Sequence, residues 1–297
     1  MTHRPDSRRG RPAAAVSIAT PAAAAAESAP TGVRLAATAF AVSAVTFALY
    51  MASLAPGLTW AHFGADGGEL LAAAIVNGVP HPPGYPLYML LLRGWLVALG
   101  WIAPASDIAW RGNVFSAVAA ALAVALTVAT VPAVLPSKSR RLLWAGIAGL
   151  ALGVSPLLWS QAIITEVYAL HMLFIALLGW ATLSGVQRGL WWLAPPVALG
   201  AAHHLTLLLL LPAVLYYVWS EERSTRRALS AILWMGVGLA VSALLYVRIP
   251  LVARQAPPIN WGFADSWQGF WWLVSGAAYR ANLFATIPDS ILTVAAL

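Results

Sequence analysis

The chain of 297 residues contains no cysteine. This absence excludes a disulfide framework and a thiolate metal site, and it leaves the redox compartment unspecified. Charged residues are also scarce, at 9% compared with about 25% in an ordinary soluble domain. Because 61% of the residues are hydrophobic and the mean hydropathy is +0.77, the composition predicts an integral membrane protein.

Lysine is almost missing, since Lys138 is the only one beside 16 arginines. The net charge of +7 therefore comes from arginine. In a membrane protein such a bias first reports orientation, because cytoplasmic loops retain Lys and Arg. We therefore expect a lipid bilayer, and no nucleic acid, as a partner.

The chain divides at about residue 33. Residues 1–32 are rich in Ala, Pro and Arg and lack a continuous apolar core, so we expect a disordered cytoplasmic tail there. Residues 33–297 are expected to form one transmembrane domain. Its last residues, SILTVAAL, look like the beginning of a further apolar segment, so the architecture extends beyond this chain in our interpretation.

Apolar runs of about 20 residues predict the membrane spans. The run at 87–102 is ambiguous, because it is short and carries Arg93 in its middle. If residues 87–102 lie in the interface, residues 190–219 must cross the membrane in two short passes. A single tilted pass of residues 190–219 would instead place Arg223, Arg226 and Arg227 on the extracytoplasmic side. The other expected spans are 35–55, 113–135, 142–159, 167–183 and 228–247.

Counting basic residues favours the interfacial arrangement. It places 12 of the 17 basic residues on the cytoplasmic side, whereas a membrane-spanning 87–102 segment places 9 there. The 12 are Arg4, Arg8, Arg9, Arg11, Arg34, Lys138, Arg140, Arg141, Arg188, Arg223, Arg226 and Arg227. In this topology most of the unusual polar residues converge on the extracytoplasmic face.

Two carboxylates stand at the start of a predicted short helix. Asp66, Gly67, Gly68 and Glu69 precede the apolar run LLAAAIV, which stops at Asn77-Gly78. The pattern D-x-x-E is typical of a capping box that stabilises the helix. A carboxylate beside a bilayer is also a functional candidate, and it can act as a general base towards a hydroxyl.

The segment VPHPPGYPLY, residues 79–88, holds four prolines and one histidine. Proline fixes its own φ and restricts the preceding residue, so a rigid loop is predicted that displays His81 and Tyr85. His81 is a binding candidate, although in isolation it could merely cap a carbonyl. Arg93, in the interfacial helix that follows, is expected to reach a lipid phosphate or a ligand.

A second group of candidates lies around the fourth span and the short passes. Glu166 near a helix start is compatible with either a structural or a functional role. Tyr168 and His171, three residues apart, are expected to share a helix face, while Glu166 points elsewhere. His203 and His204 are adjacent and diverge by roughly 100° on a helix, so they do not form a chelating pair. No metal ligand set and no cofactor are indicated, and a divalent metal stays an open alternative.

Arginines on the extracytoplasmic side call for an anionic partner. Arg248 and Arg254 occupy positions that the positive-inside rule disfavours. Arginine binds phosphate oxygens in bidentate fashion, so a lipid-linked phosphate, lipid headgroups or Asp265 are the alternatives. Asn260 and Trp261 offer surfaces on which a sugar can bind, although interfacial tryptophan has a structural explanation as well.

The motif GADGGELLAAAIVNGVPHPPGYPLYMLLLRGW resembles the opening motif of the domain of unknown function 2723 family. This family contains protein O-mannosyltransferase-like membrane proteins of the GT-C glycosyltransferase type, grouped as glycosyltransferase family 117. SPLLWSQAIITEVYALH, GAAHHLTLLLLLP and RIPLVARQAPPINWG look like its later blocks in the same order. The resemblance covers about residues 35–285.

The resemblance implies an all-α, polytopic GT-C bundle with an interfacial helical first extracytoplasmic loop. It implies transfer of a sugar, mannose in the better understood relatives, from a polyprenyl-phosphate carrier to a hydroxyl-bearing acceptor. Asp66 would be the base with Glu69 supporting or replacing it, and Glu166 would face the same cavity. Arg248 and Arg254 would hold the carrier phosphate. The expected location is the cell inner (plasma) membrane with a cytoplasmic N-terminus.

A membrane transporter or lipid flippase is the alternative, since charges and short broken helices also mark translocation sites. The absence of an inverted repeat in the sequence counts against it. A non-catalytic scaffold is a third hypothesis. Release of free polyprenyl phosphate distinguishes the enzyme from both.

Overall fold

The structure, a computed structural model, describes residues 21–135 and 140–280. Within these residues the chain is helical, and the only strand-like feature is one isolated bridge. The prediction of an all-α polytopic bundle is confirmed. The longer elements are α1 (Pro21–Ala52), α3 (Pro86–Ile102), α4 (Ile108–Val134), α5 (Arg141–Gly153), α7 (Tyr168–Arg188), α9 (Leu211–Glu222) and α10 (Thr225–Tyr246).

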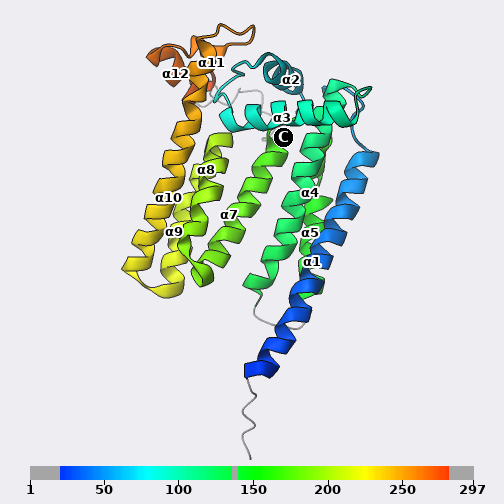
Figure 1. Ribbon diagram of the computed structural model, residues 1–297, viewed down its shortest axis with the longest axis vertical. Coiled ribbons are helices and arrows are strands. Elements are labelled where there is room, and N and C mark those ends of the chain that lie inside the picture. The colour runs from blue at the N-terminus through cyan, green and yellow to red at the C-terminus, as the bar shows by residue number, and fades with distance from the viewer. Residues whose placement is uncertain (1–20, 136–139, 281–297) are drawn as a thin grey trace, which may run out of the picture.

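Four helices of the described part are long and apolar enough to cross a membrane, namely α1, α4, α7 and α10. They stand side by side in Figure 1. Large apolar side chains also cover their outer faces: Phe40 of α1 is 76% exposed and Leu244 of α10 is 71% exposed. Apolar side chains on the outside as well as the inside are expected where hydrocarbon replaces water as the solvent.

A fifth crossing results if α5 and α6 (Pro156–Ala162) are counted together, although they are bent by 61°. We expected one span from 142 to 159, and the break lies at Ser155. Its side chain accepts a hydrogen bond from the backbone N–H of Leu158, and Pro156 occupies the first turn of α6. Both features are typical of a helix start, so the chain begins a new helix there.

Small residues allow α1, α4 and α5 to pack closely. A methyl group added to Gly149 of α5 would collide with the side chain of Val128 in α4, and one added to Gly153 would collide with Thr46 in α1. The buried Tyr50 hydroxyl donates to the carbonyl of Gly153 at 2.7 Å. Close approach at small residues and hydrogen bonds between helices are the usual means of association in membranes.

The chain between α7 and α10 makes two short antiparallel passes, as predicted for residues 190–219. The first is η2 (Leu190–Leu193) with α8 (Ala194–His203), and the second is η3 (Leu205–Leu210) with α9. His203 at the end of α8 contacts the carbonyl of Val167 just before α7. Since Arg227 at the start of α10 donates to Val186 near the end of α7, the chain has crossed the bundle twice in between.

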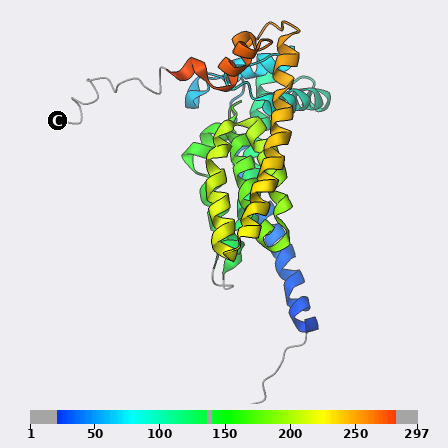
Figure 2. The same ribbon diagram turned by 90° about the vertical axis from the view of Figure 1, so that its left-hand side faces the viewer.

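The end of the bundle opposite to the start of α1 carries a cap of short elements (Figure 2). There α3 lies across the ends of the long helices, in agreement with the predicted interfacial helix (Figure 1). Trp95 of α3 donates to the carbonyl of Arg111 in α4 at 2.8 Å, which fixes this crossing. The remaining short elements are α2 (Gly67–Val76), α11 (Arg248–Ala253), η4 (Trp261–Phe263), α12 (Trp267–Val274) and η5 (Ala277–Tyr279).

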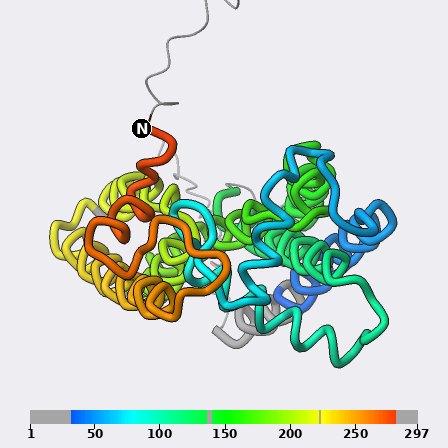
Figure 3. The backbone as a smooth tube through the Cα atoms, turned by 90° about the horizontal axis from the view of Figure 1, so that it is seen from above, coloured from blue at the N-terminus to red at the C-terminus, as the bar shows by residue number. Residues whose placement is uncertain are grey.

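Two parts of the cap that are distant in sequence meet through the backbone. The N–H of Val79 donates to the carbonyl of Ile259, and the N–H of Trp261 donates to the carbonyl of Val79, at 2.9 and 3.1 Å. Seen from above, the α11–α12 segment covers the α8–α10 side of the bundle (Figure 3). The cap thus fixes the proline-rich loop 77–85 against residues 259–261.

Two expectations concern the ends of the chain. The helix α1 already begins at Pro21, inside the segment 1–32 that we expected to be a disordered cytoplasmic tail. Alanine is the strongest helix former, so the run PAAAAAE extends the helix. Residues 1–20 of the predicted tail and the final apolar residues 290–297 lie outside the described residues.

Candidate functional site

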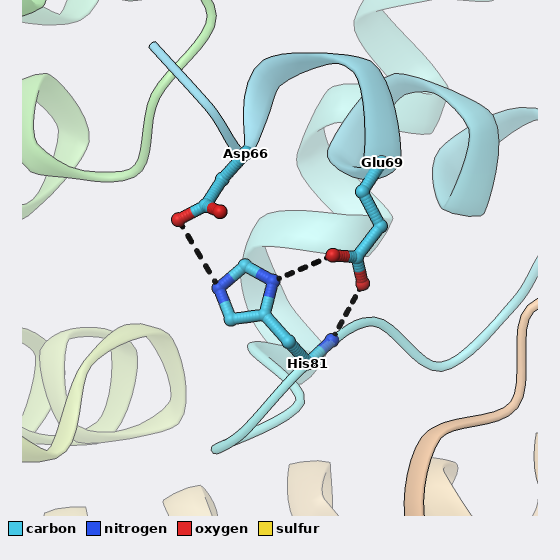
Figure 4. A network of polar contacts seen from close by, with 3 residues as sticks. All are labelled: Asp66, Glu69 and His81. Carbon is cyan, nitrogen blue, oxygen red and sulfur yellow. Dashed lines mark hydrogen bonds and ion pairs between the residues drawn. The ribbon is translucent and has the colours of Figure 1, made fainter. Parts of the chain in front are cut away.

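Asp66 and Glu69 begin α2, but they do not form the capping box that their spacing allows. Asp66 occupies the N-cap position without a capping hydrogen bond from its side chain, and its backbone has helical dihedral angles. The Glu69 side chain turns instead towards the loop 77–85. The capping interpretation is therefore wrong, and both carboxylates point towards His81 (Figure 4).

His81 is held by the backbone of its loop. α2 ends at Asn77, which adopts the left-handed conformation that favours a sharp turn. Gly84 and Tyr85 also have positive φ values, 86° and 39°, before Pro86 starts α3. These turns reverse the chain between α2 and α3 and bring His81 back to the start of α2. The proline-rich pattern predicted a rigid loop here but not this reversal.

The ring of His81 lies between the two carboxylates (Figure 4). Its backbone N–H donates to one oxygen of Glu69 at 2.8 Å, and Nδ1 donates to the other oxygen at 3.1 Å. Nε2 lies 3.6 Å from an Asp66 oxygen, which is an ion-pair distance when the ring is protonated. The side chains of His81, Glu69 and Asp66 are 7%, 26% and 48% exposed, so Asp66 is the most accessible.

The charges in this group favour a protonated imidazole. Burial lowers the pKa of His81, but the hydrogen bond to Glu69 and the negative charges of Glu69 and Asp66 raise it above its ordinary value overall. For Glu69, burial raises the pKa, and the hydrogen bonds and charge of His81 bring it below its ordinary value. The two carboxylates thus favour the protonated form of the ring over the neutral form, against the effect of burial.

Glu166, as the resemblance implied, lies beside this group. Gly67 packs against the loop that carries Glu166. A methyl group added to Gly67 would lie 2.9 Å from the carbonyl oxygen of Thr165 in that loop. The residue is 2% exposed and its side-chain oxygens have no hydrogen-bond partner among the described residues. Burial, with the charge of Asp66 as the next cause, raises the pKa of Glu166 to about 7. This carboxyl group therefore exchanges a proton near neutral pH.

A histidine cluster lies below the carboxylates, at the junction of α7 and α8. His203 is fully buried and its Nε2 donates to the carbonyl of Val167 at 3.0 Å. Thr206 links His171 and His204, with its hydroxyl 2.9 and 2.8 Å from their ring nitrogens. The rings of His203 and His204 diverge, at 6.2 Å and 61°, so they do not chelate a metal as a pair.

Two tyrosines connect the histidine cluster with the carboxylates. The ring of Tyr85 lies 5.3 Å from that of His81 and 5.8 Å from that of His204. Tyr168, half exposed, lies 6.2 Å from His204. Burial raises the pKa of the Tyr85 hydroxyl, which therefore stays neutral. Together these side chains form a wall of neutral aromatic rings beside the charged group.

The three predicted arginines do not meet at the carboxylates. Arg93 donates through Nη1 to the carbonyls of Ala74 and Ile75, and Arg248 donates to the Asn77 side chain. Both therefore lie at the far end of α2. Arg254 is exposed at the end of α11, and no side-chain hydrogen bond or ion pair is recorded for it among the described residues.

Asn260 and Trp261 border an open cavity of about 470 Å³ that is also lined by Glu69. The Trp261 ring lies 6.4 Å from the His81 ring and is 39% exposed. Asn260 donates to the carbonyl of Ala253 at 3.2 Å, while its own side-chain oxygen is buried without a partner among the described residues. A partly exposed flat ring beside a carboxylate is suited to a sugar.

The carboxylate group could also hold a cation. One donor atom from each of Asp66, Glu69 and His81 lies within 4.8 Å of the others. Because Nδ1 already donates to Glu69, a cation would use Nε2 and Asp66, with Glu69 orienting the ring. Carboxylates commonly play this orienting role for metal-binding histidines. The same geometry suits a protonated ring without any metal.

Two residues near the site were missed in the sequence. Burial raises the pKa of Tyr279, and the charges of Asp66 and Glu69 raise it further. The Tyr279 hydroxyl therefore lies close to both carboxylates. Nothing in the local sequence marks Tyr279, since tyrosine near a membrane surface is common. Thr206 was missed as well, although its position two residues after a histidine pair was a possible signal.

The chain resembles proteins with an established name. A family model described as Protein O-mannosyl-transferase TMEM260 N-terminal domain matches residues 66–227, more than half of the chain. The matched region begins at Asp66 and includes Glu69, His81 and Glu166.

Curated relatives agree with this match. Protein O-mannosyl-transferase TMEM260 of Mus musculus is 28% identical over 219 residues, which cover 68% of this chain and 29% of that protein. Protein O-mannosyl-transferase tmem260 of Dictyostelium discoideum is 29% identical over 118 residues, or 39% of this chain and 13% of that protein. The chain thus spans less than a third of these relatives. No solved structure matches it.

Proposed function

The chain belongs to the family of the Protein O-mannosyl-transferase TMEM260 N-terminal domain, and from this membership we propose that it is a membrane glycosyltransferase. It transfers a hexose, mannose in our proposal, from a polyprenyl-phosphate carrier to a hydroxyl group of a protein. The relatives' names support the reaction class and the protein acceptor. The sequence motifs that resemble GT-C enzymes and glycosyltransferase family 117 support the lipid carrier.

The accessible carboxylate of Asp66 is the observation that carries this proposal. It sits at the start of a helix without capping that helix, and it is the most exposed member of the group around His81. A general base must reach the acceptor hydroxyl, so accessibility favours Asp66. Glu69 is less available, because two donors of His81 occupy its oxygens.

In the proposed step Asp66 takes the proton of the acceptor hydroxyl. The acceptor oxygen forms a bond to the anomeric carbon, and the bond between that carbon and the phosphate oxygen breaks. The electron pair leaves with the polyprenyl phosphate, and the configuration at the anomeric carbon is inverted. His81, kept protonated by Glu69, stabilises the negative charge that develops on the leaving phosphate.

The cavity beside Trp261 is the proposed sugar site. It adjoins Glu69 and has room for a hexose at about 470 Å³. The sugar ring stacks on Trp261, and Asn260 lines the same cavity. This position places the anomeric carbon on the side of His81 and Asp66.

The bundle supports a placement at a membrane surface. The site lies in the cap at one end of the apolar helices. Among the described residues, the predicted cytoplasmic Arg141, Arg188 and Arg227 belong to the opposite ends of α5, α7 and α10. By the positive-inside rule, the site faces the extracytoplasmic side of the inner membrane and the N-terminus faces the cytoplasm. A lipid carrier can therefore reach it from the bilayer.

The test uses the full chain in detergent with radiolabelled polyprenyl-phosphate mannose and membranes as the source of acceptor. Wild-type protein should move label to protein and release free polyprenyl phosphate. Asp66→Asn should lower the rate by at least about 100-fold, which is the usual range for loss of a general base. Asp265→Asn changes an exposed carboxylate of the same cap and should have little effect.

Retained transfer by folded Asp66→Asn protein would refute the role of Asp66. A wild-type chain that binds the donor but releases no polyprenyl phosphate would refute the glycosyltransferase. Movement of the intact donor between leaflets in that case would favour the transporter alternative.

A further inference from the structure

Two arginines from different helices hold the far end of α2. Nη1 of Arg93 lies 2.8 and 2.6 Å from the carbonyl oxygens of Ala74 and Ile75. Nη2 of Arg248 lies 2.6 Å from the side-chain oxygen of Asn77. Both guanidinium groups therefore lie at one helix terminus, and their charges are close enough to repel each other.

The charge at this terminus is incompletely balanced. The C-terminus of a helix supplies about half a negative charge, against two full positive charges. In the described part of the chain neither arginine forms an ion pair with Asp or Glu. This excess of positive charge at one helix terminus favours the binding of an anion.

The carrier phosphate of the proposed reaction does not fit this position. α2 has 10 residues, so its two ends are separated by about 15 Å. Reacting groups must approach within about 3.5 Å of one another, and Asp66 and His81 are at the opposite end. The anion bound here is therefore a different molecule from the sugar donor.

A groove next to Arg93 indicates what kind of molecule it is. The groove has a volume of about 400 Å³ and runs between the end of α2, α3 and the start of α4. Apolar side chains dominate its wall, with Arg111 as a second cation. These apolar residues are Ile75, Leu96, Val97, Trp101 and Ile108. Cationic groups beside an apolar channel, on a helix that lies across the bundle end, match an anionic lipid.

We propose that Arg93 and Arg248 bind the headgroup phosphate of an anionic phospholipid, and that one acyl chain of this lipid lies in the groove along α3. This site is separate from the carboxylate group and does not depend on the proposed catalytic activity. The lipid completes the charge balance at the end of α2 and anchors α3 at the membrane surface.

The test is native mass spectrometry of the full chain in detergent with added phosphatidylglycerol or phosphatidylcholine. Wild-type protein should retain one phosphatidylglycerol at concentrations where phosphatidylcholine is lost. The double variant Arg93→Gln/Arg248→Gln should weaken this binding at least tenfold. Arg254→Gln removes an exposed arginine of the same cap and should bind as wild type. Equal weakening by Arg254→Gln would overturn the proposal.

A second variant covers the case in which the double variant fails to fold. Val97→Asp places a carboxylate in the groove wall at a position that is 57% exposed. It should weaken phosphatidylglycerol binding at least tenfold, whereas Leu91→Asp, at a 40% exposed position of α3 outside the groove, should not. Unchanged binding in Val97→Asp would overturn the proposal.

Competition identifies the source of the phosphate. Inorganic phosphate at the same concentration should leave phosphatidylglycerol bound, because it gains nothing from the groove. Displacement of phosphatidylglycerol by inorganic phosphate would refute a phospholipid site. Displacement by polyprenyl phosphate, together with loss of transfer in the double variant, would also refute it. The latter result would assign the two arginines to the sugar carrier.

Discussion

Glu69 receives two hydrogen bonds from His81, one from the backbone N–H and one from the ring. A single carboxylate thereby fixes the position of the loop and the orientation of the imidazole. Nε2 is directed at Asp66, which is the most accessible carboxylate of the group. The proposed chemistry depends on this orientation.

Replacing Glu69 by Gln should lower transfer and stability together. The amide keeps one acceptor for the backbone N–H, but it removes the charge that raises the pKa of His81. Hydrogen bonds to charged groups contribute about 1.5–3 kcal/mol, so we expect a loss of this order in unfolding free energy. We also expect at least about a tenfold lower kcat. Glu221→Gln, an exposed carboxylate in α9, is the control. Wild-type kcat in Glu69→Gln would contradict the orienting role.

Replacing Glu166 by Gln should stabilise the protein at high pH. The pKa of Glu166 is raised from 4.5 to about 7, so the folded state binds its proton more tightly than the unfolded state. The resulting stability is present below pH 4.5 and is lost as the pH rises towards 7. The charge of Asp66 increases this effect and that of His81 reduces it.

Thermal unfolding at pH 5 and pH 8 tests this expectation. Glu166→Gln should unfold at a higher temperature than wild type at pH 8, and the gain should shrink at pH 5. A gain that is larger at pH 5 would show that Glu166 is ionised and stabilising in the folded state. Glu221→Gln again serves as the control.

Gly67→Ala should separate α2 from the loop that carries Glu166. The added methyl group would lie 2.9 Å from the carbonyl oxygen of Thr165, so one of the two backbones must move. We expect a cost of about 1–3 kcal/mol, typical of overpacking. Gly94→Ala in α3 meets no atom within 4 Å and should instead stabilise its helix by up to about 1 kcal/mol. Equal melting temperatures for the two variants would contradict the close contact.

Trp261→Ala should weaken sugar binding more than it slows the chemical step. The ring lines the cavity beside Glu69, where the sugar is proposed to bind, so its loss should mainly raise KM for the donor. Stacking aromatic contacts contribute about 1 kcal/mol, which corresponds to roughly a fivefold change. Trp267→Ala, 71% exposed at the start of α12, is the matched control. A lower kcat with unchanged KM would place Trp261 in a different role.

Composition and charge were sufficient to predict the bundle and the interfacial α3. Arg93 in the middle of a short apolar run left the segment ambiguous, and the count of basic residues on the two sides favoured a helix lying across the bundle. The bend at Ser155 was not predicted, because hydropathy averages over the whole run. The Ser-Pro pair that starts α6 carries the signal at the level of single residues.

The site was predictable only as a set of residues. D-x-x-E and the proline-rich loop marked Asp66, Glu69 and His81, but the same D-x-x-E spacing is equally suited to a capping box. Whether the carboxylates form a capping box or contact His81 depends on where the loop places His81. The position of the loop is set by contacts with residues 259–261, which are far away in sequence. Arg248 was singled out as a candidate for the carrier phosphate, and its place at the end of α2 follows only from tertiary packing.

The pairing of Val79 with Ile259 and Trp261 has a consequence for biosynthesis. These two backbone hydrogen bonds join segments about 180 residues apart, and they support the loop that carries His81. During synthesis the carboxylates of α2 enter the membrane region long before their supporting segment has left the ribosome. The charged group around His81 is therefore assembled late, after α10 has inserted, and a nascent chain that stops before residue 259 carries Asp66 and Glu69 without this support.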